Sequence, residues 1–553
     1  MNKDMFLLNY KYNKRKKTMF GNQKKGIKYL RSIWSKPIDK HRNLDLISNY
    51  HNLLKINSTD SFVDDKTWND LNFNSIFSKM DRNLSGIGQQ YLFHLLHKYE
   101  SNENTLKKRY ELISYLKGNQ EIRENIQLNL LPLKGVPSYF ISYLVLNQSL
   151  PNNKFYPIFY FCSLLSMTSL LLIPLNGIFL FAALTFLLTN LLLNKLFASK
   201  IYEYFAGFSS LNSLIISAIT IGKLKTDIPI SEIELLQQKS GLLKSLKKKL
   251  GYLVIDKESL NELVLVIIEY LNMFLLFDII AYYRSVNVLL KNQNEIHKVF
   301  EAVASLDASI SIASYLSDVT HYSNPTFNTS SKISFIDMYH PLIIDPVPNS
   351  LDENSESVLV TGSNMSGKTT FIKTVGVNFI LSQTLYFSLA KSFNVPKYFI
   401  KTAIRRNEEL EEGKSYFFVE IDELNKFIKL SKEENKYLFL IDEIFRGTNT
   451  IERLASSTAV LKYLDYNNRV FVTTHDIELK DMLENNYKMF HFSEQVENGK
   501  FFFDYRIKKG PCSSGNAIKL LEIMKYPESI TKEAKSIANE LLLNNYSAIR
   551  VNK

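Results

Sequence analysis

The sequence predicts an all-α domain that carries a membrane-spanning helical hairpin, followed by an α/β domain. Apolar residues recur at helical spacing from Asp64 to Gly118, and residues 155–194 contain no charged side chain. Beyond about residue 330, short apolar runs of strand type alternate with helical segments. We therefore expect a basic N-terminal arm (1–58), a helical domain (59–330) and an α/β domain (331–553).

The amino-acid composition is typical of a folded protein. Of 553 residues, 45% are hydrophobic and 22% are charged, which is enough apolar material for several cores. The two cysteines, Cys162 and Cys512, lie far apart, so we expect neither a disulfide framework nor a cysteine metal site. A reducing, cytosolic setting fits this usage. The N-terminus lacks the apolar core and cleavage site of a secretory signal.

The net charge of +12 is concentrated at the start of the chain. Residues 1–42 hold many lysines and arginines, including those of 14–17 and 24–25, against only Asp4 and Asp39. Such an arm suits phosphate backbones or anionic lipid headgroups. The alternative is a solvated, flexible tail.

The stretch from Phe155 to Asn194 is long enough for two membrane crossings of about 20 residues each. Pro174-Leu-Asn-Gly177 supplies a turn in its middle. Lysines flank both ends, at positions 154, 195 and 200, and the turn has no charge, so both ends are predicted to lie in the cytoplasm. The chain would then sit in the cytoplasmic (inner) membrane with its α/β domain in the cytoplasm. The alternative is a cytoplasmic protein in which this hairpin is buried in a soluble core.

Two further stretches of the helical domain have distinct compositions. Leu260–Ala281 is apolar but includes Glu262, Glu269 and Asp278, which are costly in lipid, so a long buried or interfacial helix is expected. The lysine-rich segment 244–249 suits lipid headgroups or nucleic acid, and otherwise forms a solvated helix face.

A phosphate-binding loop is predicted at Val358–Thr370. An apolar run ends at Gly362, four residues follow, and Gly367-Lys368-Thr369 opens a helical segment. In this pattern the glycines let backbone N–H groups converge on phosphate oxygens, and the lysine reaches the β- and γ-phosphates. The threonine that follows the lysine can ligate Mg²⁺.

Two later strand ends carry side chains that suit phosphoryl transfer to water. The apolar run 437–441 ends in Asp442-Glu443, of which the first carboxylate can hold Mg²⁺ and the second can activate the attacking water. The run 469–473 leads to His475, which can contact the γ-phosphate or the water. Further on, strands over 488–492 and 501–507 are joined by Asn498-Gly499, and 527–543 has the pattern of an amphipathic helix.

With these motifs, the chain resembles the MutS group of ATPases within the ABC superfamily. The similar stretches are Thr361–Thr370 (the P-loop), Leu440–Thr450 (the Asp-Glu strand with its Arg-Gly-Thr tail), Thr473–His475 (a histidine switch), Glu412–Glu420 (Gly-x-Ser-x-Phe-x-x-Glu), His340-Pro341, and, for the lever helices, Leu71–Leu96 and Ala304–Ala313.

The resemblance implies an α/β P-loop ATPase domain of ABC/MutS type behind a lever-like helical domain. It implies ATP and Mg²⁺ as cofactors, a homodimer in which Ser415 reaches the partner's nucleotide, and double-stranded DNA as a partner. The site residues that it implies are Glu443 and His475 for catalysis, Gly362, Asn364, Gly367, Lys368, Thr369, Thr370 and Ser415 for the nucleotide, and Thr369 with Asp442 for the metal.

The sequence also departs from that family. Nothing before residue 60 resembles the mismatch-reading domain, and the hydrophobic hairpin stands where lever helices should run uninterrupted. A membrane-associated MutS-related subgroup is more similar, and shares a motif found here as Phe503-Asp-Tyr-Arg506. We therefore expect a membrane-tethered ATPase whose nucleotide cycle is coupled to DNA binding. The alternative is a membrane-associated ATPase of ABC type that acts on a protein or lipid partner.

Overall fold

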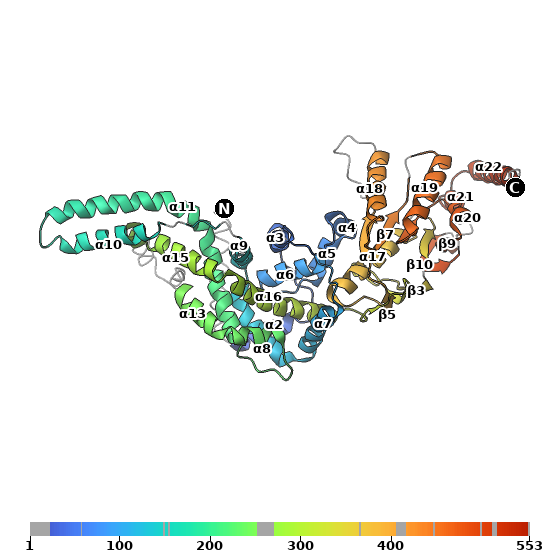
Figure 1. Cartoon of the computed structure of the whole chain (residues 1–553). Helices are drawn as coiled ribbons and strands as arrows, with labels where there is room; N and C mark the ends of the chain where they lie inside the picture. The colour runs from blue at the N-terminus through green and yellow to red at the C-terminus, as the bar shows by residue number, and fades with distance from the viewer. Residues whose placement is uncertain are drawn as a thin grey trace. The chain divides into compact units, whose positions relative to one another are not determined.

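The computed structural model describes residues 23–56, 58–147, 150–152, 155–250, 270–354, 356–363, 366–404, 416–445, 448–497, 500–510 and 517–550. These residues form two compact units (Figure 1). The helical unit comprises Met1–Asp60, Phe77–Lys98 and Lys107–Val319. The α/β unit comprises Ser61–Ile76, Tyr99–Leu106 and Thr320–Lys553. The domain boundaries expected from the sequence stay predictions.

The helical unit is built around α16 (Gln293–Leu316), an apolar helix that is 89% buried over its most hydrophobic window. Its burial identifies it as a core helix, although its length and composition would also suit a membrane crossing. The other helices of this unit are α2 (Gln23–Ile33), α3 (Leu44–Lys55), α6 (Gly86–His97), α8 (Gln120–Leu130), η1 (Leu131–Leu133), η2 (Val136–Tyr139), α9 (Phe140–Leu146), α10 (Pro157–Leu172), α11 (Ile178–Ile221), α12 (Ser231–Gln238), α13 (Ser240–Leu250) and α15 (Phe277–Lys291); α5 (Phe73–Met80) and α7 (Glu103–Gly118) hold residues of both units.

Part of the expected basic arm is folded. In α3, Ile47 and Tyr50 are fully buried, and Tyr50 packs its ring against Phe300 of α16. Asn43 begins this helix by accepting a hydrogen bond from the Leu46 amide. Residues 1–22, with the cluster 14–17, lie outside the described residues.

The charge-free stretch forms two antiparallel helices, α10 and the first part of α11, which project from the helical unit (Figure 1). Here the usual distribution of side chains is reversed. Ser166, Ala183 and Asn190 are at most 1% exposed, whereas Phe181 and Leu188 are 73% and 66% exposed. Small and polar side chains thus fill the contact between the helices, and the large apolar ones face outward. Of the described helices, Ile178–Phe197 within α11 is long and apolar enough to cross a membrane while being only 11% buried.

The expected single helix over Leu260–Ala281 is wrong for its described part. Residues 270–275 are helical, but Leu276 has a left-handed backbone with φ 54°, and α15 begins at Phe277. The break frees backbone carbonyls, and the amide of Asn190 donates to the Phe274 carbonyl at 2.6 Å. Residues 251–269 lie outside the described residues.

The α/β unit contains a mixed six-stranded sheet in the order β10-β9-β4-β8-β7-β6. Strands β9, β4, β8, β7 and β6 run parallel, and β10 is antiparallel to β9. A four-stranded sheet in the order β1-β5-β2-β3 lies in the same unit. The strands are β1 (Thr326–Phe327), β2 (Ile333–Met338), β3 (Asn349–Asn354), β4 (Ser357–Thr361), β5 (Ser392–Val395), β6 (Phe399–Ala403), β7 (Tyr437–Asp442), β8 (Arg469–Thr473), β9 (Tyr487–Glu497) and β10 (Lys500–Lys509).

This sheet confirms the predicted α/β pattern. The expected strands 437–441 and 469–473 are β7 and β8, while 488–492 and 501–507 lie within β9 and β10. Residues of β7 and β8 are almost all buried because helices cover the sheet. The helices of this unit are α4 (Asp65–Asp70), α17 (Lys368–Leu385), α18 (Tyr416–Leu430), α19 (Thr450–Asp465), α20 (Leu479–Leu483), α21 (Ala517–Ile523) and α22 (Glu528–Arg550).

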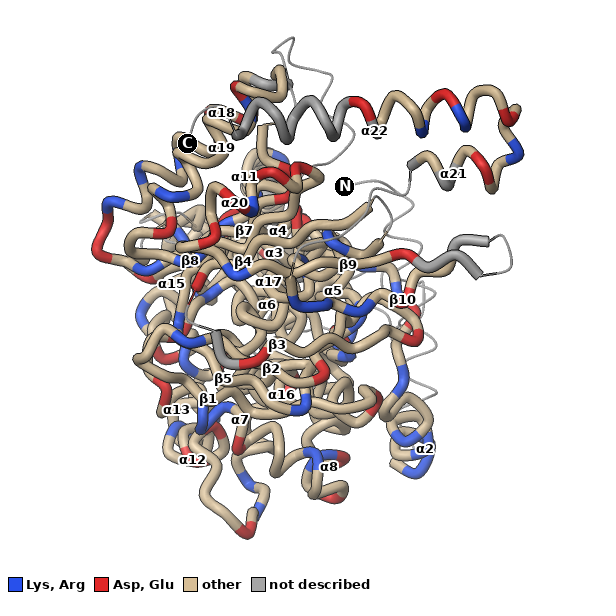
Figure 2. The backbone as a smooth tube through the Cα atoms, turned by 90° about the vertical axis from the view of Figure 1, so that its right-hand side faces the viewer, with Lys and Arg blue, Asp and Glu red and all other residues tan. Residues whose placement is uncertain are grey.

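Helix α22 contains the predicted amphipathic segment 527–543 from Glu528 onward. Acidic and basic residues alternate along it (Figure 2), and Lys532 pairs with Glu528 one turn away at 2.9 Å. Ile530 and Ile537 are about half exposed on the same helix.

Candidate nucleotide site

The motif residues meet because three neighbouring strands end at one edge of the sheet. Strand β8 lies between β4 and β7, with Thr473 in register with both Val360 and Asp442. Parallel strands place their carboxyl ends on the same side, where ligands of α/β sheets bind. The phosphate loop, the Asp-Glu pair and His475 follow these three strand ends.

The phosphate loop has the backbone that its glycines permit. Gly362 and Gly367 have φ values of 143° and 105°, in the region that favours glycine. A Cβ atom at Gly362 would lie 2.6 Å from the Phe492 carbonyl oxygen, so no larger residue fits there without movement. Helix α17 begins directly after Gly367, which places its positive N-terminal end at the loop.

The amino group of Lys368 is directed into this loop. The residue is 4% exposed, and its Nζ atom donates to the carbonyl oxygens of Gly362 and Ser363 at 2.8 Å each. A buried ammonium group needs such acceptors, and phosphate oxygens are stronger ones. Ser363 is held in turn by a hydrogen bond from its hydroxyl to Glu494 of β9.

Oxygen atoms suited to Mg²⁺ lie side by side at the strand ends. The Thr369 hydroxyl is 2.9 Å and 3.1 Å from the two carboxylate oxygens of Asp442, and the Thr473 hydroxyl donates to Oδ1 of Asp442 at 2.5 Å. Among the described residues, no three His, Cys, Asp or Glu side chains form a group that could hold a metal. The Thr369–Asp442 pair nevertheless fits Mg²⁺, which takes one or two protein oxygens and completes its shell with water and phosphate.

Glu443 and His475 contact each other beside the lysine. The His475 Nε2 atom lies 2.8 Å from Oε1 of Glu443 and 3.4 Å from Nζ of Lys368. Glu443 has a left-handed backbone with φ 59°, and its N–H donates to the Thr473 carbonyl at 3.0 Å. Such backbone strain at a non-glycine residue is frequent at functional sites. The two side chains therefore face the position that a γ-phosphate would occupy if Lys368 held the nucleotide.

The next residue after the histidine anchors this segment to α19. Asp476 receives two hydrogen bonds from the Arg453 guanidinium, at 2.8 Å and 2.7 Å, in a partly buried pair. On the other side, the Thr474 N–H donates to the Val360 carbonyl at 3.1 Å. His475 is thus fixed from both sides, by β4 and by α19.

Comparison with known proteins shows what this part of the chain is similar to. Residues 358–542 match the family model of MutS domain V. The chain is also 31% identical over 260 residues to the DNA mismatch repair protein MutS of Lactobacillus acidophilus, a match that covers 44% of this chain and 30% of that protein. The MutS protein of Listeria welshimeri is 30% identical over 272 residues, covering 47% of this chain and 31% of that protein. The chain spans about a third of the length of the curated relatives that it matches.

Within the region that matches MutS domain V, the structure brings together seven of the predicted site residues: Gly362, Gly367, Lys368, Thr369, Asp442, Glu443 and His475. Thr370 is exposed in the first turn of α17. Its backbone carbonyl accepts a hydrogen bond from the Thr374 hydroxyl. Asn364 and Ser415 lie outside the described residues, as does the Arg446-Gly447 part of the Arg-Gly-Thr tail.

Three contacts in the region that matches MutS domain V were not expected from the sequence: those of Thr473 with Asp442, Glu494 with Ser363, and Arg453 with Asp476. The position of Thr473 at a strand end was a usable signal for the first. The other two join residues 131 and 23 positions apart, and no spacing rule relates them.

Proposed function

We propose that this chain is an ATPase that hydrolyses ATP with Mg²⁺, works as a homodimer and is tethered to the cytoplasmic membrane by α10 and the first part of α11. One observation carries the proposal. A lysine in a phosphate loop, a hydroxyl–carboxylate pair and a glutamate–histidine pair meet at three adjacent strand ends, in a region that matches MutS domain V.

The proposed chemistry uses each of these groups once. Lys368 exchanges the carbonyl oxygens of its own loop for the β- and γ-phosphate oxygens of ATP. Thr369 and Asp442 would hold the metal ion, and the ion would supply positive charge to neutralise the charge that develops on the phosphates. Glu443 accepts a proton from water as the water oxygen bonds to the γ-phosphorus and the bond to the bridging oxygen breaks, giving ADP and phosphate.

His475 is proposed to sense the γ-phosphate. Its Nε2 atom contacts both Glu443 and Lys368, so a phosphate bound by Lys368 would compete for this imidazole. The histidine would then release Glu443 toward the attacking water. By the resemblance noted above, Ser415 of a second copy would complete the site, which makes the dimer the hydrolysing form.

The membrane part of the proposal is supported by the reversed side-chain distribution of the hairpin. Ser166 and Ala183 are buried between its helices, and Phe181, Leu184 and Leu188 face outward. Within a bilayer, outward apolar side chains cost nothing, whereas in water they form an aggregation-prone surface. Retention of the protein in membranes after alkaline washing is the expected result. Release into the supernatant would overturn the tether and leave the ATPase proposal intact.

Double-stranded DNA is the partner proposed for the nucleotide cycle. The support is the match to MutS domain V and the excess of lysine and arginine in residues 1–42. Binding of duplex DNA by the purified protein is expected to weaken steeply with salt, and deletion of residues 1–42 should reduce the salt slope. If the purified protein does not bind duplex DNA even at low salt, the proposal that DNA is the partner is wrong.

A protein or lipid partner is the second candidate. The exposed apolar surface of the hairpin favours it, because a partner inside the bilayer could contact that surface directly. Crosslinking in cells with the Glu443→Gln variant, followed by identification of the captured molecules, separates the two. Recovery of DNA supports the first candidate, and recovery of a membrane protein or lipid without DNA supports the second.

A further inference from the structure

A cluster of lysines covers one end of the helical unit. Helix α13 buries Leu243, Leu246 and Leu250, and these three positions define its inner face. The lysines of the helix lie on the remaining surface and are all exposed. Two further exposed lysines lie on the turn that follows α11. Together they form the lysine patch: Lys223, Lys225, Lys244, Lys247, Lys248 and Lys249.

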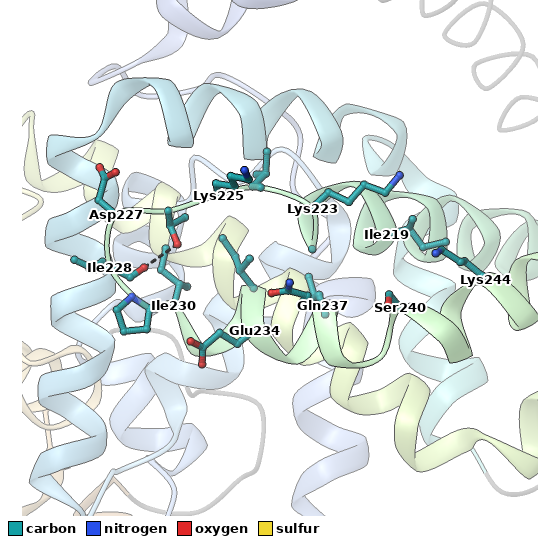
Figure 3. A pocket seen from close by; sticks show the side chains of 16 residues that line it. Ile219, Lys223, Lys225, Asp227, Ile228, Ile230, Glu234, Gln237, Ser240 and Lys244 are labelled. Atoms are coloured by element: carbon teal, nitrogen blue, oxygen red, sulfur yellow. Dashed lines mark hydrogen bonds between the residues drawn. The ribbon is translucent and has the colours of Figure 1, made fainter.

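The patch holds more positive charge than its surroundings neutralise. Within the described part of the chain, none of its six lysines forms an ion pair, although other lysines of this unit do, such as Lys239 with Glu295 at 2.6 Å. An open pocket of about 700 Å³ joins the two halves of the patch, and Figure 3 shows the amino groups of Lys223 and Lys244 at the same end of it. Asp227 and Glu234 also line this pocket, so the charge is reduced there and is greatest along α13.

Helix α11 connects the hairpin to the part of the helical unit that carries the patch. Helix α11 runs without interruption from Ile178 in the hairpin to Ile221, and α13 packs against it. Helix α13 also packs against α15, which contacts α10. Figure 1 shows α13 on the side of the helical unit from which the hairpin projects. With the hairpin inserted in a bilayer, α13 would therefore lie on the membrane side of the helical unit.

Aromatic side chains at the base of the hairpin support this placement. Tyr156 precedes α10, and Tyr160 in its first turns is 42% exposed. Tyrosines of this kind are enriched at membrane–water interfaces, where the ring is apolar and the hydroxyl is hydrated. The chain thus presents an apolar surface on the hairpin, tyrosines at its base, and lysines that form no ion pair with the described residues.

We infer that the lysine patch binds the anionic headgroups of the bilayer that holds the hairpin. The inference rests on the proposed membrane tether. Juxtamembrane lysines attract anionic lipids, and the attraction falls off within about one Debye length of the surface. The patch would fix the height and tilt of the helical unit over the membrane, which the hairpin alone leaves free to rotate.

The test uses the full chain in nanodiscs of phosphatidylcholine alone or with one quarter phosphatidylglycerol. Acetylation of each lysine by an amine-reactive ester is followed by mass spectrometry at 50 mM and 1 M salt. The α13 lysines are expected to react several-fold more slowly in the discs that contain phosphatidylglycerol, and only at low salt. Lys429 and Lys432, which are exposed on the α/β unit, serve as controls and should react equally in both.

A variant that lacks the α13 lysines tests the same inference, because its association with vesicles of different lipid composition can be compared with that of the wild type. The chain is synthesised cell-free with vesicles of either composition and floated on a density gradient. Lys→Gln at 244, 247, 248 and 249 should remove the gain in flotation that phosphatidylglycerol gives, and leave flotation with phosphatidylcholine unchanged. Lys→Gln at 429, 432, 436 and 462 changes the net charge equally and should keep the gain.

Three other results of these experiments would each contradict a different part of the inference. Equal acetylation in both discs overturns the headgroup contact but leaves the tether standing. Protection of α13 by duplex DNA, without protection by phosphatidylglycerol, overturns it in favour of nucleic acid. A chain that enters neither disc overturns the tether, and the inference with it.

Discussion

The hydroxyl of Thr369 lies 2.9 Å from Oδ2 of Asp442, although the two residues are 73 positions apart in the chain. Thr369 is the second residue of helix α17 and Asp442 ends strand β7, so this contact joins the start of the helix after the phosphate loop to the strand that carries the Asp-Glu pair. Thr473 at the end of β8 donates to the same carboxylate and fixes its orientation. The arrangement brings two oxygen atoms suited to Mg²⁺ together, without a dedicated metal cage among the described residues.

The first prediction concerns the metal ion. Asp442→Asn should raise the Mg²⁺ concentration needed for half-maximal ATP hydrolysis at least about tenfold, because one anionic ligand is lost. Thr369→Ala should do the same, while Thr369→Ser keeps the hydroxyl and should remain close to the wild type. Equal Mg²⁺ requirements for Thr369→Ala and Thr369→Ser would contradict the ligand role.

The second prediction concerns the Arg453–Asp476 ion pair, which anchors the residue after His475 to α19. Arg453→Gln should lower kcat about tenfold with little change in KM, because a displaced histidine misplaces Glu443. Arg453→Lys retains the charge and should be intermediate. Lys532→Gln breaks the exposed Lys532–Glu528 pair and serves as a control that should leave kcat unchanged. Unaltered kcat in Arg453→Gln would remove the positioning role.

The third prediction concerns acid stability of the helical unit. Burial, followed by the charge of His51, lowers the pKa of His94 to about 3 from 6.5. Between these values the unfolded chain binds a proton that the folded chain does not, so the free energy of unfolding falls as pH decreases from 6.5. The slope is at most about 1.4 kcal/mol per pH unit for this group.

Thermal unfolding at pH 7.5 and 5.0 measures this effect. His94→Gln should lose less stability than the wild type over that interval, whatever its stability at pH 7.5. Burial also lowers the pKa of His97, so His97 retains a slope of the same sign in the variant. The expectation fails if both proteins lose equal stability.

The fourth prediction concerns the hairpin. Leu188 is 66% exposed near the middle of the apolar part of α11, so Leu188→Lys would place a charge in hydrocarbon at a cost of about 3 kcal/mol. We expect a severalfold smaller membrane fraction. Tyr466→Lys, at an 86% exposed position of the α/β unit, should leave the membrane fraction unchanged. If Leu188→Lys instead raises soluble yield without any change in the membrane fraction, the hairpin is not embedded.

The sequence predicted those parts of the fold and site that depend on local pattern. The strands β7 and β8 were predictable because continuous apolar runs end in polar residues, and the phosphate loop because its spacing is short and fixed. The length of α11 could not be predicted, because Lys195, Lys200 and Glu203 interrupt its apolar pattern while the helix continues to Ile221. The break at Leu276 was also unpredictable, since an uncharged, buried leucine gives no turn signal.

Contacts between distant side chains could not be predicted either. The pairing of Arg453 with Asp476 depends on how α19 packs beside β8, which the sequence does not state. By contrast, the meeting of Thr369, Asp442 and His475 followed from one topological rule, that parallel strands end at the same edge.

Hydrolysis and binding of ATP by Glu443→Gln, measured on the same preparation, test the central claim most directly. We expect ATP binding within about twofold of the wild type and a single-turnover rate lower by a factor of at least about 100, because the group that takes the proton from water is lost. Lys368→Ala, measured alongside, should lose binding itself. A Glu443→Gln protein that hydrolyses ATP at the wild-type rate would contradict the proposed site.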